Sequence, residues 1–214
     1  ARCLGVELHQ ADLRALPAGE RADLVLCLDD VVNHFRDPGG LTEAFASIRA
    51  RMADRGVLVF DANTPAAYQA AFTADRVIEG AAQLVAWRPA WNPQSGIAEA
   101  AIEIFDLRAS GEWARSTARH AQRHYQRQDL ERMLKAAGLQ PLGARGLTAD
   151  GVLHGHADWR LHPKVFFAAR RFAGEPHDFC AARPTVPDPD LGCYPIGVVV
   201  GYALRDPATA LAEL

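Results

Sequence analysis

The chain has 214 residues, of which 49% are hydrophobic and 23% are charged, and its formal net charge is −3. This balance is typical of a folded domain with a small appendage and excludes a disordered or fibrous chain. The small negative charge argues against nucleic acid or an anionic membrane as a partner. No apolar run reaches the roughly 20 residues that a membrane-spanning helix needs.

The cysteines indicate a reduced compartment. Cys3, Cys27, Cys180 and Cys193 show no C-x-x-C spacing, and Cys27 lies within an apolar run that predicts a core strand. No signal peptide is recognisable, and the first residues resemble the middle of a domain. We therefore expect a cytoplasmic protein without disulfides.

Two apolar runs joined by one amphipathic helix predict neighbouring parallel strands. The runs cover residues 22–28 and 56–60, and the helix between them covers 41–52, with Gly56 as its stop signal. A further strand is predicted upstream, at residues 5–9. Continuous aliphatic strands separated by a helix are typical of a sheet that is covered on both faces. We expect an α/β fold with a doubly wound, mostly parallel, Rossmann-like sheet.

Carboxylate or amide side chains follow each of these strands. Asp12 follows the upstream strand, Asp29 and Asp30 follow the next, and Asp61 and Asn63 follow the last. Aspartate is common in turns, so each residue alone has a structural explanation. Ligands of such sheets bind at the carboxyl ends of the strands, so the whole set predicts a polar ligand rich in hydroxyls or amines.

The pattern changes after residue 75. Apolar and polar residues alternate between residues 76 and 125, with turn-like segments between the runs, which predicts an antiparallel meander with one wet face. An amphipathic helix that ends near Gly138 and strands at 139–145 and 165–170 follow. The predicted parts are a partial cofactor-binding α/β core (1–75), an inserted antiparallel β cap (76–125), the C-terminal part of the core (126–171) and a proline-rich extension (172–214) with a candidate strand at 196–202.

Two stretches carry a resemblance to a known family. The first begins with Gln10-Ala11-Asp12-Leu13-Arg14 after the upstream strand. It continues after the next strand with Leu28-Asp29-Asp30-Val31-Val32-Asn33 and, after one helix, with Phe60-Asp61-Ala62-Asn63-Thr64-Pro65. The second is His120-Ala121-Gln122-Arg123-His124-Tyr125, which precedes the second helix. In this order the stretches resemble class I S-adenosylmethionine-dependent methyltransferases of the small-molecule type with a β cap. The resemblance covers roughly residues 1–171 and implies methyl transfer to a nitrogen or oxygen nucleophile.

The resemblance implies five cofactor-binding residues. Asp12, with Leu13 beside it, would accept a hydrogen bond from the adenine amine of S-adenosylmethionine. Leu28 and Asp29 would flank the methionine end, and Asn33 belongs to the same cofactor-binding stretch.

It also implies five residues on the acceptor side. Asp61 and Asn63 would face the point of methyl transfer and bind the substrate. His120 and Tyr125 would be the catalytic residues, because transfer to an amine or hydroxyl often needs a base. The planar guanidinium of Arg123 suits an acceptor carboxylate. An ordinary strand histidine and a solvated arginine are the structural alternatives.

No G-x-G-x-G stretch occurs in the chain, although the family uses one to bring the backbone close to the cofactor. We expect an N-terminally truncated methyltransferase that binds S-adenosylmethionine poorly by itself and leaves a sheet edge unpaired. The alternative is a non-catalytic, methyltransferase-like binding module.

A metal-dependent hydrolase is the third alternative. His154-Gly155-His156-Ala157-Asp158 resembles a metal-ligand motif, but Trp159 follows where that motif has another histidine. We predict a surface loop and no metal. The sequence leaves open the acceptor and the oligomeric state.

Overall fold

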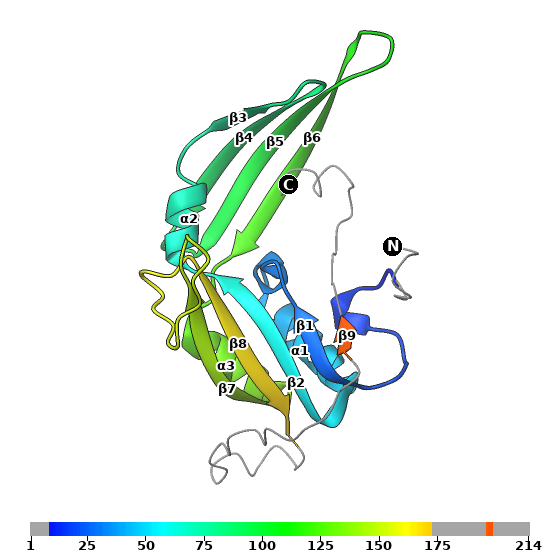
Figure 1. Ribbon diagram of the computed structural model, residues 1–214, viewed down its shortest axis with the longest axis vertical. Coiled ribbons are helices and arrows are strands. Elements are labelled where there is room, and N and C mark those ends of the chain that lie inside the picture. The colour runs from blue at the N-terminus through cyan, green and yellow to red at the C-terminus, as the bar shows by residue number, and fades with distance from the viewer. Residues whose placement is uncertain (1–8, 173–195, 199–214) are drawn as a thin grey trace.

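The computed structural model describes residues 9–172 and 196–198 (Figure 1). The predicted upstream strand lies almost entirely outside these residues, and so do Cys3, Cys180, Cys193 and most of the extension. No helix in the described segments is long and apolar enough to cross a membrane.

The main sheet has the strand order β7-β8-β2-β1-β9. β1 is parallel to β2 and to β9, whereas β8 is antiparallel to both β2 and β7. Leu24 pairs with Val57 and Cys27 with Phe60, which confirms the predicted adjacent parallel strands. The strands are β1 (Ala22–Cys27), β2 (Met52–Asn63), β7 (Leu139–Leu147), β8 (Lys164–Arg171) and β9 (Ile196–Val198).

The pairing of β9 bears on the predicted free edge. Its three residues pair with Leu24, Val25 and Leu26, so the flank of β1 that faces away from β2 is occupied. The predicted unpaired edge, however, is the flank of the upstream strand at residues 5–9. That strand lies almost entirely outside the described residues, so the unpaired edge stays a prediction.

Helix α1 (Pro38–Ala50) connects β1 to β2 and begins and ends earlier than the predicted 41–52. Asp37 caps it, because its Oδ2 accepts a hydrogen bond from the Gly40 N–H at 2.8 Å. This bond satisfies an amide that has no partner within the first turn. α1 packs against α3 (Arg127–Ala136), which follows the cap.

The prediction that Gly56 stops this helix is wrong. Arg51 already caps the helix, β2 begins at Met52, and Gly56 lies within the strand. A Cβ atom at Gly56 would lie 2.9 Å from the carbonyl oxygen of Ala22. Glycine is therefore needed here for the close approach of β1 and β2, not for the end of a helix.

The main core lies between the sheet and helices α1 and α3. Phe60 stacks on Phe167 at a centroid distance of 4.9 Å and an interplanar angle of 2°, and its ring also contacts Phe45 at 5.3 Å. All three side chains are at most 1% exposed. They join α1, β2 and β8, which are separate in the sequence.

The second sheet is the cap, with the strand order β3-β4-β5-β6 and antiparallel pairing throughout. It projects away from the main sheet (Figure 1). Along β5 the buried residues Ala98, Ala100 and Ile102 alternate with exposed Glu99 and Ala101, so the predicted meander with one wet face is confirmed. The strands are β3 (Arg76–Glu79), β4 (Gln83–Asn92), β5 (Ile97–Leu107) and β6 (Trp113–Arg123).

Helix α2 (Pro65–Ala71) leads from β2 into the cap. Tyr68 of this helix is fully buried and stacks on Trp91 of β4 at 4.7 Å, and Phe72, just after the helix, contacts Trp87 at 5.3 Å. These rings form a second core that fixes the base of the cap.

We predict that Phe60→Ala lowers the free energy of unfolding by about 3–5 kcal/mol, because it removes a ring between two others and leaves a cavity. Ile78, which is 54% exposed on β3, provides the control: Ile78→Ala should change stability by less than about 0.5 kcal/mol. Urea unfolding followed by circular dichroism measures both. Equal effects would contradict the assigned core.

Candidate active site

The site begins at the turn that follows β1. Asp29 and Asp30 both have left-handed backbones, with φ of 63° and 47°. Non-glycine residues rarely adopt this conformation, which costs about 1–2 kcal/mol per residue. Leu28 is 38% exposed, and Asp29 is exposed as well. The strained turn therefore places an apolar and an acidic side chain at the surface, beside the end of the strand.

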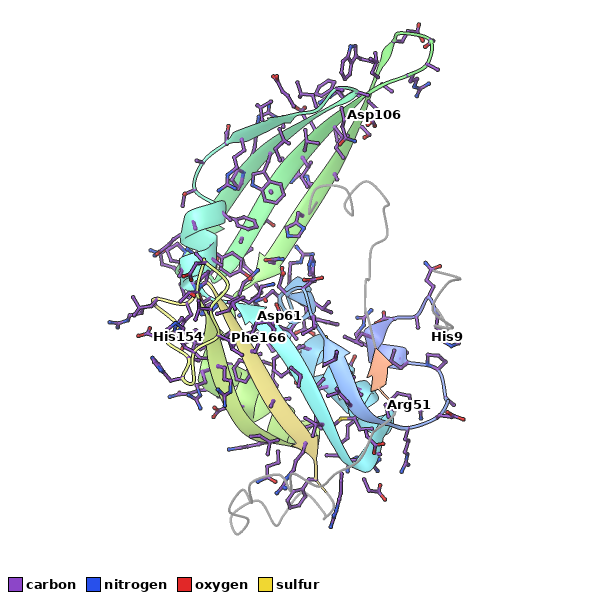
Figure 2. The ribbon with its side chains drawn as sticks, in the orientation of Figure 1. His9, Arg51, Asp61, Asp106, His154 and Phe166 are labelled. Atoms are coloured by element: carbon purple, nitrogen blue, oxygen red, sulfur yellow. The ribbon has the colours of Figure 1, made fainter. Side chains whose placement is uncertain are left out.

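Asp61, at the end of β2, joins this turn to β8 (Figure 2). Its Oδ2 lies 2.7 Å from Nζ of Lys164 and accepts a hydrogen bond from the Asp30 N–H at 3.1 Å. Lys164 also lies 3.3 Å from Oδ1 of Asp30. The Asp61 side chain is 1% exposed, and its Oδ1 has no hydrogen-bond partner among the residues that the structure describes.

Burial and charge act against each other in this group. Burial raises the pKa of Asp61, although Lys164 and the Asp30 N–H both lower it. Burial alone would lower the pKa of Lys164, but the carboxylates of Asp61 and Asp30 together raise it. With both acids ionised, the three side chains carry one net negative charge, held in a largely dry environment.

Gln122 of β6 brings the cap into the same network. Its Nε2 donates a hydrogen bond to Oδ2 of Asp30, and its Oε1 accepts one from Nδ2 of Asn63 at 3.3 Å. Gln122 is 2% exposed. The carboxyl edge of the main sheet is thus bonded directly to the base of the cap.

Asn33 adds further hydrogen bonds to the junction between the carboxyl edge of the main sheet and the base of the cap. Its Nδ2 donates to the Arg123 carbonyl at 2.8 Å, and its Oδ1 accepts from the Asn63 N–H at 2.9 Å. The side chain is fully buried. Both ends of the amide are engaged, so Asn33 holds the 3-10 turn η3 (Val31–His34) against β2 and β6.

His120 of β6 lies beside three other rings. Its ring is 5.0 Å from His34, 5.7 Å from Trp87 and 6.2 Å from Phe72. The residue is 8% exposed. Burial, and secondarily the neighbouring His34, lowers the pKa of His120 to about 4. The imidazole is therefore neutral near neutral pH.

Tyr125 and Arg123 lie where β6 leaves the cap. The Tyr125 hydroxyl donates to the Phe35 carbonyl at 2.6 Å, and burial raises the pKa of Tyr125 to about 12. Arg123 donates to the Arg36 carbonyl at 3.0 Å, and its guanidinium lies 5.7 Å from the centre of the Tyr125 ring. Both side chains thus hold the backbone that connects η3 to α1.

Asp12 and Leu13 belong to another part of the core. Asp12 caps the 3-10 turn η2 (Leu13–Ala15) and forms an ion pair with Arg14 at 2.6 Å. Leu13 is 4% exposed and packs in the main core. η2 contacts α1.

No role was predicted for Lys164 or Gln122. Gln122 had a signal, because it belongs to the stretch 120–125 that carries the resemblance and alternates with His120 on the same face of a predicted strand. Lys164 had none beyond its position before an apolar run.

The H-x-H-x-D stretch lies in the loop between β7 and β8 (Figure 2). His162, which is 4% exposed, lies with its ring 5.0 Å from His154 and accepts the Asp158 N–H at 2.9 Å through Nδ1. Within residues 9–172, no group of three or more histidine, cysteine or acidic side chains could hold a metal ion.

The sequence matches no family model and no curated protein. The structure, however, is similar to solved methyltransferases. An S-adenosylmethionine-dependent methyltransferase from Clostridium acetobutylicum ATCC 824 has a TM-score of 0.64 at 20% identity, covering 80% of this chain and 68% of that one. The CcbJ methyltransferase from Streptomyces caelestis has a TM-score of 0.59 at 15% identity, covering 76% and 62%.

The sugar N-methyltransferase KedS8 from Streptoalloteichus sp. ATCC 53650 has a TM-score of 0.57 at 21% identity, covering 80% of this chain and 64% of that one. The chain thus spans about two thirds of the length of these proteins. The likeness confirms the predicted fold, a methyltransferase-like α/β core with an antiparallel β cap.

We predict that Lys164→Met lowers the free energy of unfolding by about 3 kcal/mol near neutral pH, because it leaves the Asp61 carboxylate buried without its cation. The loss should shrink in acid, where Asp61, whose pKa burial raises, takes up a proton. Lys135→Met, at an exposed helix position, is the control and should change stability by less than about 0.5 kcal/mol. Urea unfolding across a pH series tests this. A loss independent of pH would contradict the role of Asp61.

We predict that the lowered pKa of His120 makes the stability of the fold depend on pH. Its pKa falls from 6.5 in the unfolded chain to about 4 in the fold, so between these values the unfolded state binds more protons. Stability should therefore fall as the pH is lowered through this range, by about 3 kcal/mol in total. His120→Asn should show a shallower fall when Tm is measured against pH. Parallel curves would contradict the burial of a neutral imidazole.

Proposed function

We propose that the protein transfers a methyl group from S-adenosylmethionine to a nitrogen or oxygen atom of a small-molecule acceptor. The observation that carries this proposal is the junction at the carboxyl ends of β1 and β2. There an exposed turn lies beside a buried acidic network, and a cap residue, Gln122, bonds to Asp30 of the turn and to Asn63 at the end of β2. The likeness of the fold to methyltransferases supports this assignment.

The turn after β1 has side chains that can bind S-adenosylmethionine, the methyl donor. Leu28 offers an exposed apolar surface and Asp29 an exposed carboxylate on the same turn. S-adenosylmethionine has an apolar ring face and a cationic ammonium group, so these two side chains fit it. The amino pentose methyltransferase CalS10, solved with S-adenosylmethionine bound, has a TM-score of 0.52 to this chain. We also propose Asp12 as an acceptor for the adenine amine, since its carboxylate is at the surface.

The base of the cap has side chains that can bind the small molecule that accepts the methyl group. When bound, S-adenosylmethionine supplies an electrophilic methyl group on a positively charged sulfur, and transfer moves that charge toward the acceptor. The net negative charge of Asp30, Asp61 and Lys164 stabilises a cation that forms beside them. The neutral imidazole of His120 can accept a hydrogen bond from the acceptor and orient it, whereas its lowered pKa of about 4 makes it a weak base.

Of the two predicted catalytic residues, we assign contact with the acceptor to His120 rather than to Tyr125. The Tyr125 hydroxyl is bonded to a carbonyl and its pKa is raised to about 12, which makes it a poor base near neutral pH. Among nitrogen and oxygen acceptors we favour an amine on a sugar-like molecule. CalS10 is an amino pentose methyltransferase and KedS8 is a sugar N-methyltransferase, which supports this choice.

We predict that Asp29→Asn weakens the binding of S-adenosylhomocysteine, the demethylated cofactor, by about tenfold or more, because a charge-assisted hydrogen bond is lost. The affinity of this chain should already be weak, with a Kd of ~1 mM, since no G-x-G-x-G stretch is present. NMR titration is suited to this range. Asp106→Asn, at the far end of the cap (Figure 2), is the control. Equal affinities of wild type and Asp29→Asn would show that Asp29 does not bind the cofactor, and no binding by either would favour a non-catalytic module that has lost cofactor binding.

A further inference from the structure

The turn of Asp29 and Asp30 needs external support. Two consecutive non-glycine residues with φ of 63° and 47° do not hold this shape by local preference. The 3-10 turn that follows has Asp30 at its N-cap, yet the Asp30 side chain does not bond to that turn. It points instead to partners on other strands.

Asp30 is bonded to both sheets. Its N–H donates to Asp61 of β2 at 3.1 Å, and its Oδ1 lies 3.3 Å from Nζ of Lys164 on β8. Its Oδ2 accepts from Nε2 of Gln122, which belongs to the cap. The Asp30 N–H and both carboxylate oxygens of Asp30 are thus engaged, and one of the three partners comes from the second sheet.

The Gln122 amide is held in a defined orientation. Its Oε1 accepts from Asn63 at 3.3 Å, which leaves Nε2 to face Asp30, and Nε2 also lies 3.4 Å from Nε2 of His34. The side chain is 2% exposed, so water does not compete for these contacts. A hydrogen bond in such surroundings is stronger than one at the surface.

We propose that Gln122 is a positioning residue that holds the Asp29–Asp30 turn through the Asp30 carboxylate and so makes donor binding depend on the position of the cap. This inference rests on the proposed function, because it takes Asp29 as a donor-binding residue. Coupling of this kind is reciprocal, so a bound donor also stabilises the contact between cap and core. The cap strand that carries His120 then influences the donor side as well as the acceptor side.

The first experiment needs no ligand. Hydrogen exchange of the Asp30 amide, which donates to Asp61, reports directly on the turn. In Gln122→Leu this amide should exchange roughly tenfold faster than in wild type. Gln83→Leu is a matched control, because Gln83 donates to Asp106 at 2.8 Å in the same kind of glutamine–aspartate contact at an exposed position of the cap. It should leave the Asp30 amide unchanged.

The second experiment is a double-mutant cycle on S-adenosylhomocysteine affinity. Gln122→Leu should weaken binding roughly tenfold when Asp29 is present and have little effect in the Asp29→Asn background. A merely structural role of Gln122 would weaken binding equally in both backgrounds. If Gln122→Leu does not fold, Gln122→Asn keeps the amide but shortens its reach, and should give the same pattern with smaller changes.

An unchanged exchange rate of the Asp30 amide in the folded variant would overturn the proposal, and so would equal losses of affinity with and without Asp29. If wild type binds no S-adenosylhomocysteine, the proposed function fails. The exchange rates then decide by themselves whether Gln122 holds the turn.

Discussion

The ion pair between Lys164 and Asp61 is the contact on which the junction of the two sheets depends. A carboxylate that is 1% exposed is unfavourable unless a cation and hydrogen-bond donors surround it. Lys164 supplies the cation from β8, and the Asp30 N–H supplies a donor from the turn after β1. The charge can therefore be buried only when β1, β2 and β8 are in register. The Asp61–Lys164 site therefore forms only when the strands of this largely apolar sheet are correctly paired.

The same requirement places the cap. A second carboxylate, Asp30, lies beside the first, and one lysine does not neutralise both. Gln122 donates the further hydrogen bond from β6, and Asn33 fixes the backbone of the adjoining residues to β2. The cap is thus held at its base by polar contacts that are specific in direction, whereas the rings of α2 and β4 contribute apolar packing. Polar contacts specify the geometry because a small displacement leaves a buried group without a partner.

The sequence was sufficient to predict β1, β2 and the cap, because each leaves a simple pattern. Burial on both faces gives continuous aliphatic runs, and one wet face gives alternation. Gly56 was misinterpreted because its reason is the approach of Ala22 from another strand, which no local pattern records. Lys164 was not predicted for the same reason, because it lies 134 residues from Asp30 and meets it only in the folded chain. Gln122 had a local signal, but its partner Asp30, 92 residues away, could not be inferred from that signal. Asp61 and Asn63, by contrast, stood out because a strand end determines where they lie.

Asp30 combines a strained backbone with a charged side chain that both sheets contact. Asp30 adopts an unfavourable backbone conformation and at the same time provides the carboxylate that β8 and the cap both contact. A glycine would remove the strain but also the carboxylate, so the two sheets would lose their common partner. An aspartate therefore occupies a position where the backbone alone would favour glycine, and its unfavourable conformation is offset by contacts from outside the turn. Because one of these contacts comes from Gln122 of the cap, the shape of the turn depends in part on the position of the cap, which couples the exposed Asp29 to the sheet that carries His120.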